Sequence, residues 1–270
     1  MRHVAASVSP EAYQAIVQLV RKERDNKMNK VIQGLWIGAE LSVMEQLSIS
    51  SFLLNGHQYH LYVYDEVKNV PGGAVLKDAN QILPSSKIFK YKQQRSYAGF
   101  ANFFRYKLLL EHGGWWADTD TICLKPFDFP EQHVFATEIC EGLEVVTSGI
   151  IKAPIGSEAM GYAWEVCQNK DPEQLVWGET GPRLVAEVVK KYSLERYAKA
   201  YHVFCPLGHA DWPRMLEPAP EVALTASTYA IHLWNENWKG AGQDKNARYP
   251  DNCLYEQLKR RYLNGGSLAS

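Results

Sequence analysis

Residues 31–64 read VIQGLWIGAELSVMEQLSISSFLLNGHQYHLYVY, and this stretch decides the fold class. Residues 31–37 are short, apolar and rich in strand-forming side chains, which predicts a β-strand. Ser42-Val43-Met44-Glu45 has the pattern of a capping box, and it predicts the start of a helix that Asn55-Gly56 ends. Residues 59–64 (YHLYVY) predict a second strand. The order strand, helix, strand favours a right-handed βαβ unit and therefore a parallel sheet.

The rest of the chain continues the α/β pattern. Residues 96–112 carry apolar side chains at the three-and-four spacing of a one-sided helix, which Gly113-Gly114 ends. Residues 115–124 then predict a strand interrupted by polar residues. Further strands are predicted at 134–139 and 145–151, and further helices at 157–168, 181–191 and 251–262. We therefore expect a Rossmann-like, mainly parallel twisted sheet with helices on both faces and a ligand site at the carboxyl ends of the strands.

Composition limits the kinds of partner. The chain has 270 residues and a formal net charge of −1, so it offers no long-range attraction for a polyanion, and we expect no nucleic-acid partner. Its five cysteines are odd in number and form no CxxC pair, which favours reduced thiols and a cytosolic location. No apolar run reaches the ~20 residues that span a bilayer. Any contact with a membrane would be peripheral.

The N-terminal segment is expected to be an appendage, residues 1–30, before a single domain at 31–270. Residues 10–27 have an apolar stripe at helical spacing and a basic end. Such a helix can rest on an anionic membrane surface, here at the inner membrane. Packing against the main domain or against a partner chain is at least as good an alternative.

Asp118-Thr119-Asp120 is the motif that points to chemistry. Alternate residues of an extended chain point to the same side, so both carboxylates are expected to face one way and to repel each other. A divalent cation relieves that repulsion, and hard oxygen ligands suit Mn²⁺ or Mg²⁺ bridged to phosphate. A D-x-D alone is weak evidence, because capped loops and solvated turns carry the same pattern.

The surrounding residues make the pattern specific. The run from Ser96 to Asp120 is SYAGFANFFRYKLLLEHGGWWADTD, with Asn102 and Arg105 on one face of the predicted helix. It resembles the donor-binding core of the DXD-containing sugar transferases of GT-A fold. That group includes bacterial capsule and lipopolysaccharide transferases, yeast α-mannosyltransferases, α-1,4-galactosyltransferases and the clostridial glucosylating toxins. Leu35-Trp36-Ile37-Gly38 and Ile231-His232-Leu233-Trp234-Asn235 resemble two further segments of the family.

The resemblance implies a role for each matching residue. Trp36 would stack on the base, usually uracil, and Arg105 would hold the donor sugar or its diphosphate. Asp118, Asp120 and Arg105 would be the catalytic residues, and Asp118, Asp120 and His232 the metal ligands. The donor site would comprise Trp36, Ile37, Asn102, Arg105, Trp116, Asp118, Trp234, Asn235 and Trp238.

Several of these residues also have an ordinary structural interpretation. Trp36 and His232 could be core residues, and Arg105 could lie on the surface of a helix. Asn102 departs from the family, which has Asp there, and this places the choice of sugar in doubt. Glu179-Thr180-Gly181-Pro182 resembles a family turn near the acceptor. Glu138 and Ser148-Gly149 are candidates for the acceptor pocket.

The predicted function is transfer of a hexosyl unit from a UDP-sugar to a hydroxyl of a glycan or lipid-linked acceptor, with retention at the anomeric carbon, in surface polysaccharide synthesis. The cofactor would be Mn²⁺ or Mg²⁺. Two other classes stay open: a non-catalytic sugar- or nucleotide-binding module, and a nucleotidyltransferase on a similar sheet. The second usually needs a Gly-rich phosphate loop near the first strand, and the sequence has none there.

Overall fold

The computed structural model describes residues 30–220 and 222–263. The predicted helix at residues 10–27, and with it the membrane contact expected of residues 1–30, lies outside these residues. No helix within the described ranges combines the length and the apolar character needed to cross a bilayer.

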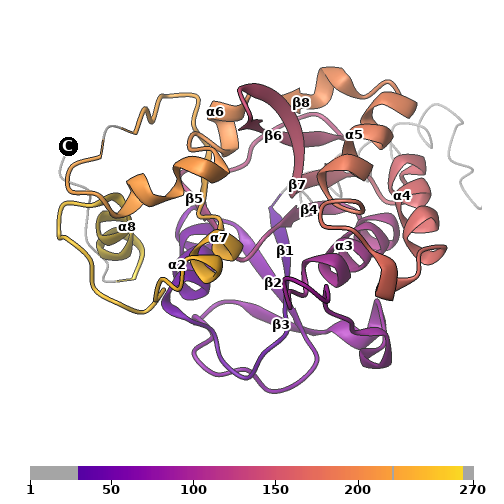
Figure 1. Ribbon diagram of the computed structural model, residues 1–270, viewed down its shortest axis with the longest axis horizontal. Coiled ribbons are helices and arrows are strands. Elements are labelled where there is room, and N and C mark those ends of the chain that lie inside the picture. The colour runs from indigo at the N-terminus through magenta and orange to yellow at the C-terminus, as the bar shows by residue number, and fades with distance from the viewer. Residues whose placement is uncertain (1–29, 221, 264–270) are drawn as a thin grey trace, which may run out of the picture.

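A seven-stranded sheet forms the centre of the molecule, in the order β3-β2-β1-β4-β7-β6-β8 (Figure 1). Strands β3, β2, β1 and β4 are parallel to one another, and β6 and β8 are also parallel. Only β7 runs antiparallel to its neighbours, β4 and β6. The strands of this sheet are β1 (Val31–Trp36), β2 (Gln58–Val63), β3 (Val75–Asp78), β4 (Gly114–Ala117), β6 (Val134–Cys140), β7 (Leu143–Ala153) and β8 (Ala198–Lys199). The mainly parallel sheet predicted from the sequence is confirmed.

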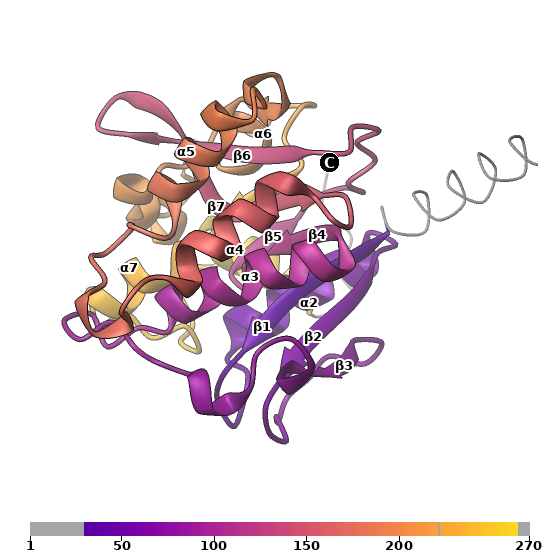
Figure 2. The ribbon, with the colours of Figure 1, turned by 90° about the vertical axis from the view of Figure 1, so that its right-hand side faces the viewer.

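Helices cover both faces of this sheet (Figure 2). One layer holds α3 (Ala98–His112), α4 (Glu158–Gln168) and α5 (Pro182–Lys191), and the other holds α2 (Val43–Leu54) and α8 (Leu254–Tyr262). The short helices α6 (Tyr201–Phe204) and α7 (Asn235–Gly240) pack with the second layer. The described residues also contain five 3-10 segments: Ala79–Gln81, Ser85–Lys87, Pro172–Gln174, Glu195–Tyr197 and His209–Leu216.

The central strands supply side chains to two separate cores. In β4, Trp115 packs into the core under α2 and α8, whereas its neighbour Trp116 packs into the core under α3, α4 and α5. In β1, Ile32 packs into the core under α2 and α8, and Leu35 packs into the core under α3, α4 and α5. Strands buried on both faces are expected to be apolar almost throughout, which is why β1 reads as a short apolar run rather than as an alternating one.

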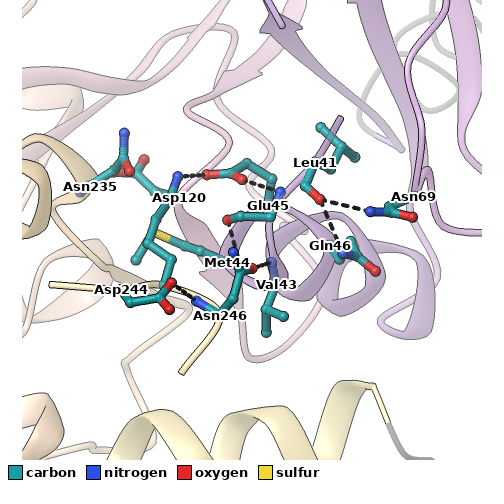
Figure 3. Close-up of polar contacts among 12 residues, drawn as sticks. Leu41, Val43, Met44, Glu45, Gln46, Asn69, Asp120, Asn235, Asp244 and Asn246 are labelled. Atoms are coloured by element: carbon teal, nitrogen blue, oxygen red, sulfur yellow. Dashed lines mark hydrogen bonds and ion pairs between the residues drawn. The ribbon is translucent and has the colours of Figure 1, made fainter. Parts of the chain in front are cut away.

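The capping box at the start of α2 is confirmed. Ser42 Oγ accepts a hydrogen bond from Met44 N at 3.2 Å, and Ser42 N donates to Glu45 Oε2 at 2.8 Å. Glu45 is buried and also pairs with Lys245 Nζ at 2.5 Å. Asn246 Oδ1 accepts from Val43 N (Figure 3). These contacts fasten the loop after α7 to the first turn of α2.

The Gly113-Gly114 pair ends α3 as predicted. Gly113 has φ +64°, which favours glycine, and a Cβ there would lie 2.6 Å from Ile155 N. The close approach sets β4 directly against the residues that follow β7.

The boundary predicted at 115–124 is wrong in one respect. The chain does not continue as one strand, because a turn separates β4 from β5 (Thr121–Cys123), and β5 pairs antiparallel with β9 (Ala230–His232) in a small second sheet. The helix predicted at 251–262 begins only at Leu254, with Cys253 as its N-cap.

Candidate functional site

The D-x-D lies in the turn between β4 and β5 rather than in extended chain. Thr121 N donates to Asp118 O at 3.0 Å and closes this turn, and Asp118 N donates to Gly149 O of β7 at 2.8 Å. Period-two alternation is therefore not what brings the two carboxylates together. The turn and the side-chain contacts described next bring them together.

Asp118 is fixed by two donors on one of its oxygens. Oδ1 accepts from Arg105 Nη2 at 2.7 Å and from Trp116 Nε1 at 2.8 Å. Burial raises the pKa of Asp118, and the neighbouring Arg105 guanidinium offsets only part of that rise, while the Asp120 charge adds to it. Oδ2 has neither of these contacts and remains available to a ligand.

Asp120 is held by His232 and by the start of α7. His232 Nε2 lies 3.1 Å from Asp120 Oδ1, and Asn235 N donates to Oδ2 at 2.8 Å. Burial alone would raise the pKa of Asp120, but the His232 charge and hydrogen bond outweigh burial and lower this pKa to about 2. Burial likewise opposes the charge on His232, yet Asp120 raises the pKa of His232 well above its ordinary value. The two side chains form a buried ion pair.

Strand β9 explains how a residue so distant in sequence reaches the turn. His232 is directly opposite Thr121 in the β5–β9 pair. Trp234, two residues after the end of β9, has φ +59°, a conformation uncommon for a residue with a side chain. Its Nε1 donates to Leu207 O at 3.0 Å and its ring lies 4.0 Å from the His232 ring, so packing holds this backbone in place. The sharp bend at Trp234 directs the Asn235 amide at Asp120.

Asp118, Asp120 and His232 form a group that can hold a divalent cation. One ligand atom from each lies within 4.8 Å of the others. Two carboxylates and one imidazole suit Mn²⁺ or Mg²⁺, and imidazole favours Mn²⁺ of the two. The residues present therefore fit the expected ion. A bound cation would take over the neutralising role that the His232 proton has without it.

Arg105 is a buried residue of α3 and not a surface arginine. It is 3% exposed, its Nη1 donates to Ser148 O at 2.5 Å, and its guanidinium lies 4.9 Å from the centre of the Trp116 ring. Within the described residues its Nε is buried and has no hydrogen-bond partner.

Two cavities meet at these residues. The first, which we call the Trp36 cavity, encloses about 630 Å³. Trp36, Ile37 and Trp116 contribute to its wall, and so does a group of polar and basic side chains: Lys90, Gln94, Arg95, Ser96 and Lys239. Trp36 is partly buried, and the ammonium of Lys245 lies 5.7 Å from the centre of its ring. Trp36 Nε1 has no hydrogen-bond partner in the described chain.

The second cavity, which we call the Glu138 cavity, encloses about 380 Å³. Both volumes lie in the range of small-ligand sites. The two cavities share a wall made of Ala98, Arg105, Asp118, Asp120, Asn235 and Glu236. His232, Trp234 and Asn102 line only the Glu138 cavity. Two of the candidate metal ligands, Asp118 and Asp120, therefore stand where the two cavities join, and His232 lies on the Glu138 side of that wall.

The Thr180-Gly181-Pro182 turn lies against the face of α3 that carries Asn102. Asn102 Nδ2 donates to Thr180 Oγ1 at 3.3 Å, and Tyr106 Oη donates to Thr180 O at 2.7 Å. A Cβ on Gly181 would lie 3.2 Å from Asn102 Nδ2. Gly181 and Pro182 line the Glu138 cavity together with Glu138, Ser148 and Gly149, the residues predicted for the acceptor side.

Trp238 does not lie where the sequence predicted. It is fully buried, and its ring packs against Trp212 at 5.5 Å and Tyr255 at 4.9 Å. It belongs to the core under α2 and α8 and borders neither cavity. Helix α7 turns one face to the core and the other to the site, and Trp238 is on the core face.

Sequence reasoning missed several lining residues. Tyr91, Trp177 and His209 line the Glu138 cavity, and Lys90 and Arg95 line the Trp36 cavity. All lie in loops or 3-10 segments without a motif. The excess of aromatic residues in the composition was the one available signal for Tyr91 and Trp177.

Two family models match the chain. Residues 38–136 match "Glycosyltransferase sugar-binding region containing DXD motif" and residues 170–262 match "Alpha 1,4-glycosyltransferase conserved region". The first region contains Asn102, Arg105 and the D-x-D, and the second contains His232 and Trp234. The two halves of the site thus come from two regions that are both found in glycosyltransferases.

Named relatives agree with these matches. Human "Alpha-1,4-N-acetylglucosaminyltransferase" is 22% identical over 208 residues, which are 68% of this chain and 58% of that protein. Human "Lactosylceramide 4-alpha-galactosyltransferase" is 30% identical over 101 residues, which are 32% of this chain and 28% of that protein. The matches thus span 58% and 28% of the length of these relatives. A solved structure titled "PaToxG Glycosyltransferase" aligns at a TM-score of 0.45 and 12% identity, covering 93% of this chain and 95% of that one, and is too distant to add to the argument.

The resemblance predicted from the sequence is confirmed by these comparisons. The chain matches the DXD-containing sugar-binding region first and the α-1,4-glycosyltransferase region after it, and the relatives that it resembles are named as glycosyltransferases.

Proposed function

We propose that this chain, a glycosyltransferase of the DXD-containing type, transfers a hexosyl unit from a UDP-sugar to a hydroxyl of a glycan or lipid-linked acceptor. Mn²⁺ or Mg²⁺ would be held by Asp118, Asp120 and His232. The observation that carries the proposal is the position of these three residues, whose ligand atoms lie within 4.8 Å of one another beside the junction of two cavities. Group transfer needs two substrates that meet at one point, and the junction provides that point.

The Trp36 cavity suits the nucleotide part of the donor. The Trp36 indole ring on its wall offers a flat apolar face for a base. The basic side chains of Lys90, Arg95 and Lys239 line the same cavity. A diphosphate carries negative charge, so these cations favour it over a neutral ligand.

Arg105 is positioned to stabilise charge on the leaving group. As the bond between the anomeric carbon and phosphate breaks, negative charge grows on the diphosphate. Arg105 is already held by Ser148, Asp118 and the Trp116 ring, so it needs no rearrangement to face that charge. A bound divalent cation would act as a Lewis acid on the same phosphate oxygens.

The Glu138 cavity would then take the sugar of the donor and the acceptor. The names of both relatives specify an α linkage, which supports retention where the donor is an α-linked sugar nucleotide. The name of one relative contains a glycolipid, and this supports a lipid-linked acceptor as one choice. Surface polysaccharide synthesis and a cytosolic location, with peripheral contact at the inner membrane, are part of this proposal. The free thiols of all five cysteines support the location.

The test is a donor screen with purified protein. Release of UDP from UDP-glucose, UDP-galactose, UDP-N-acetylglucosamine and UDP-N-acetylgalactosamine is measured with Mn²⁺, with Mg²⁺ and with EDTA. Products on sugar glycosides are read by mass spectrometry. We expect turnover of at least one donor with the metal and loss of turnover with EDTA.

Other outcomes would assign the chain differently. Tight binding of UDP without any turnover in the full screen would favour a non-catalytic binding module. Release of pyrophosphate from a nucleoside triphosphate and a sugar phosphate would favour a nucleotidyltransferase. Either result would contradict the proposed transfer reaction.

A further inference from the structure

Glu138 is a buried carboxylate that the proposed donor chemistry does not use. It lies on β6, is 6% exposed and lines the Glu138 cavity. Its Oε2 is buried and has no hydrogen bond in the described chain, although His209 Nδ1 lies 3.5 Å away. Leaving a buried carboxylate oxygen without a full set of partners costs stability, so a ligand that donates a hydrogen bond would remove a real penalty.

The charge of Glu138 decides which part of a substrate can lie beside it. A carboxylate repels a diphosphate but accepts hydrogen bonds from hydroxyl groups. The cations of the site, Arg105 and the candidate metal, stand at the wall shared with the Trp36 cavity. This charge distribution would orient a nucleotide sugar with its diphosphate at that wall and with neutral hydroxyl groups toward Glu138.

The mouth of the same cavity carries an aromatic surface. Trp177 is 42% exposed although it is large and apolar, and its ring centre lies 5.0 Å from that of Tyr91. Both residues line the Glu138 cavity, and so do Val145 and Pro182. A sugar ring has an apolar face of C–H groups and a rim of hydroxyl groups. A flat indole at the mouth and an unsatisfied acceptor in the interior match that combination.

From these contacts we infer that the acceptor is a saccharide whose ring stacks on Trp177 and whose hydroxyl groups donate to Glu138 and contact His209. The inference rests on the proposed function and adds the acceptor class and its binding residues to it. A lone lipid, serine or threonine hydroxyl would bring neither the apolar ring face nor several donors, and a tyrosine would bring only one donor.

The experiment measures binding of two probes to the full-length protein. UDP with Mn²⁺ is titrated by calorimetry, and the methyl glycosides of glucose, galactose, N-acetylglucosamine and lactose are then titrated into the UDP-saturated protein by saturation-transfer NMR. The variants are Glu138→Gln, which keeps the size of the side chain, and Trp177→Ala, which removes an exposed ring. Tyr201→Ala is the matched control, because Tyr201 is also an exposed aromatic residue, at 37%, and does not line the cavity.

We expect at least one glycoside to bind, and both Glu138→Gln and Trp177→Ala to weaken it at least tenfold while UDP affinity changes less than twofold. The control should leave both affinities unchanged. If UDP binds but no glycoside does, or if the two variants keep glycoside affinity, the acceptor assignment is wrong while the donor site stands. If the wild-type protein fails to bind UDP or any donor of the screen, the proposed function itself is wrong.

Discussion

Replacing Asp120 with asparagine is expected to lower the free energy of unfolding, whereas replacing Asp118 with asparagine is not. In the metal-free protein the pKa of Asp120 is lowered to about 2 from an ordinary value of 3.8, with His232 outweighing burial. At about 1.4 kcal/mol for each tenfold change in proton affinity, this difference corresponds to about 2–3 kcal/mol of stability at neutral pH. Asp120→Asn should lower the free energy of unfolding by that amount.

Asp118→Asn is the matched comparison. Burial raises the pKa of Asp118 despite Arg105, so its ionised form is favoured less in the folded than in the unfolded chain. An asparagine keeps one oxygen to accept from Arg105 and Trp116. Asp118→Asn should therefore leave the metal-free protein as stable as the wild type or more so.

Urea unfolding with EDTA and with Mn²⁺ measures both effects. Mn²⁺ at a hundred times its dissociation constant should stabilise the wild type by about 2.7 kcal/mol, and neither variant should gain this. The Asp120 contribution should be complete above pH 3.8 and should decline as the pH falls toward 2. Equal destabilisation by the two variants, or no loss in Asp120→Asn, would refute the ion-pair argument.

Four further outcomes are expected. Trp36→Ala should weaken UDP binding by about 1–3 kcal/mol in calorimetry if the ring stacks on the base, whereas unchanged affinity would place the base elsewhere. Asn102→Asp should change the ranking of UDP-sugars in the donor screen more than UDP affinity, and identical donor profiles would contradict a contact with the sugar. Gly149→Ala would place a Cβ 3.3 Å from both Asp118 Oδ2 and His232 Cε1. Mn²⁺ affinity should therefore fall at least tenfold while the free energy of unfolding stays that of the wild type. Wild-type Mn²⁺ affinity in this variant would show that the added methyl group does not crowd the candidate ligands. Mn²⁺ affinity should fall steadily as the pH decreases, because the His232 proton, whose pKa is raised, competes with the ion, and a flat profile would argue against ligation by His232.

The parts of the fold that follow from local sequence were predicted well. The capping box at Ser42 and the glycine stop at Gly113 fix helix ends through contacts within a few residues, and both were found as predicted. The split between β4 and β5 was not predicted, because it depends on β9 pairing with Thr121 from a distant part of the chain. Long-range pairings of this kind leave little trace in a local pattern.

The site residues that belong to a sequence motif were predicted from the sequence. Arg105, Asp118, Asp120 and His232 do converge, but the geometry that unites them lies in a turn and in an unusual backbone angle at Trp234. Trp238 was misplaced because a helix of six residues presents two faces, and proximity in sequence to Trp234 does not say which face is turned inward. Its complete burial gives the answer.

The pairing of β5 with β9 also bears on how the chain matures. His232 meets Asp120 across a separation of 112 residues, so a growing chain lacks the third candidate ligand until the segment that carries His232 has been synthesised. Contacts that close such long loops form late and slowly. The complete group of three candidate ligands therefore exists only after β9 has paired with β5, so the proposed cation site would be finished late in folding.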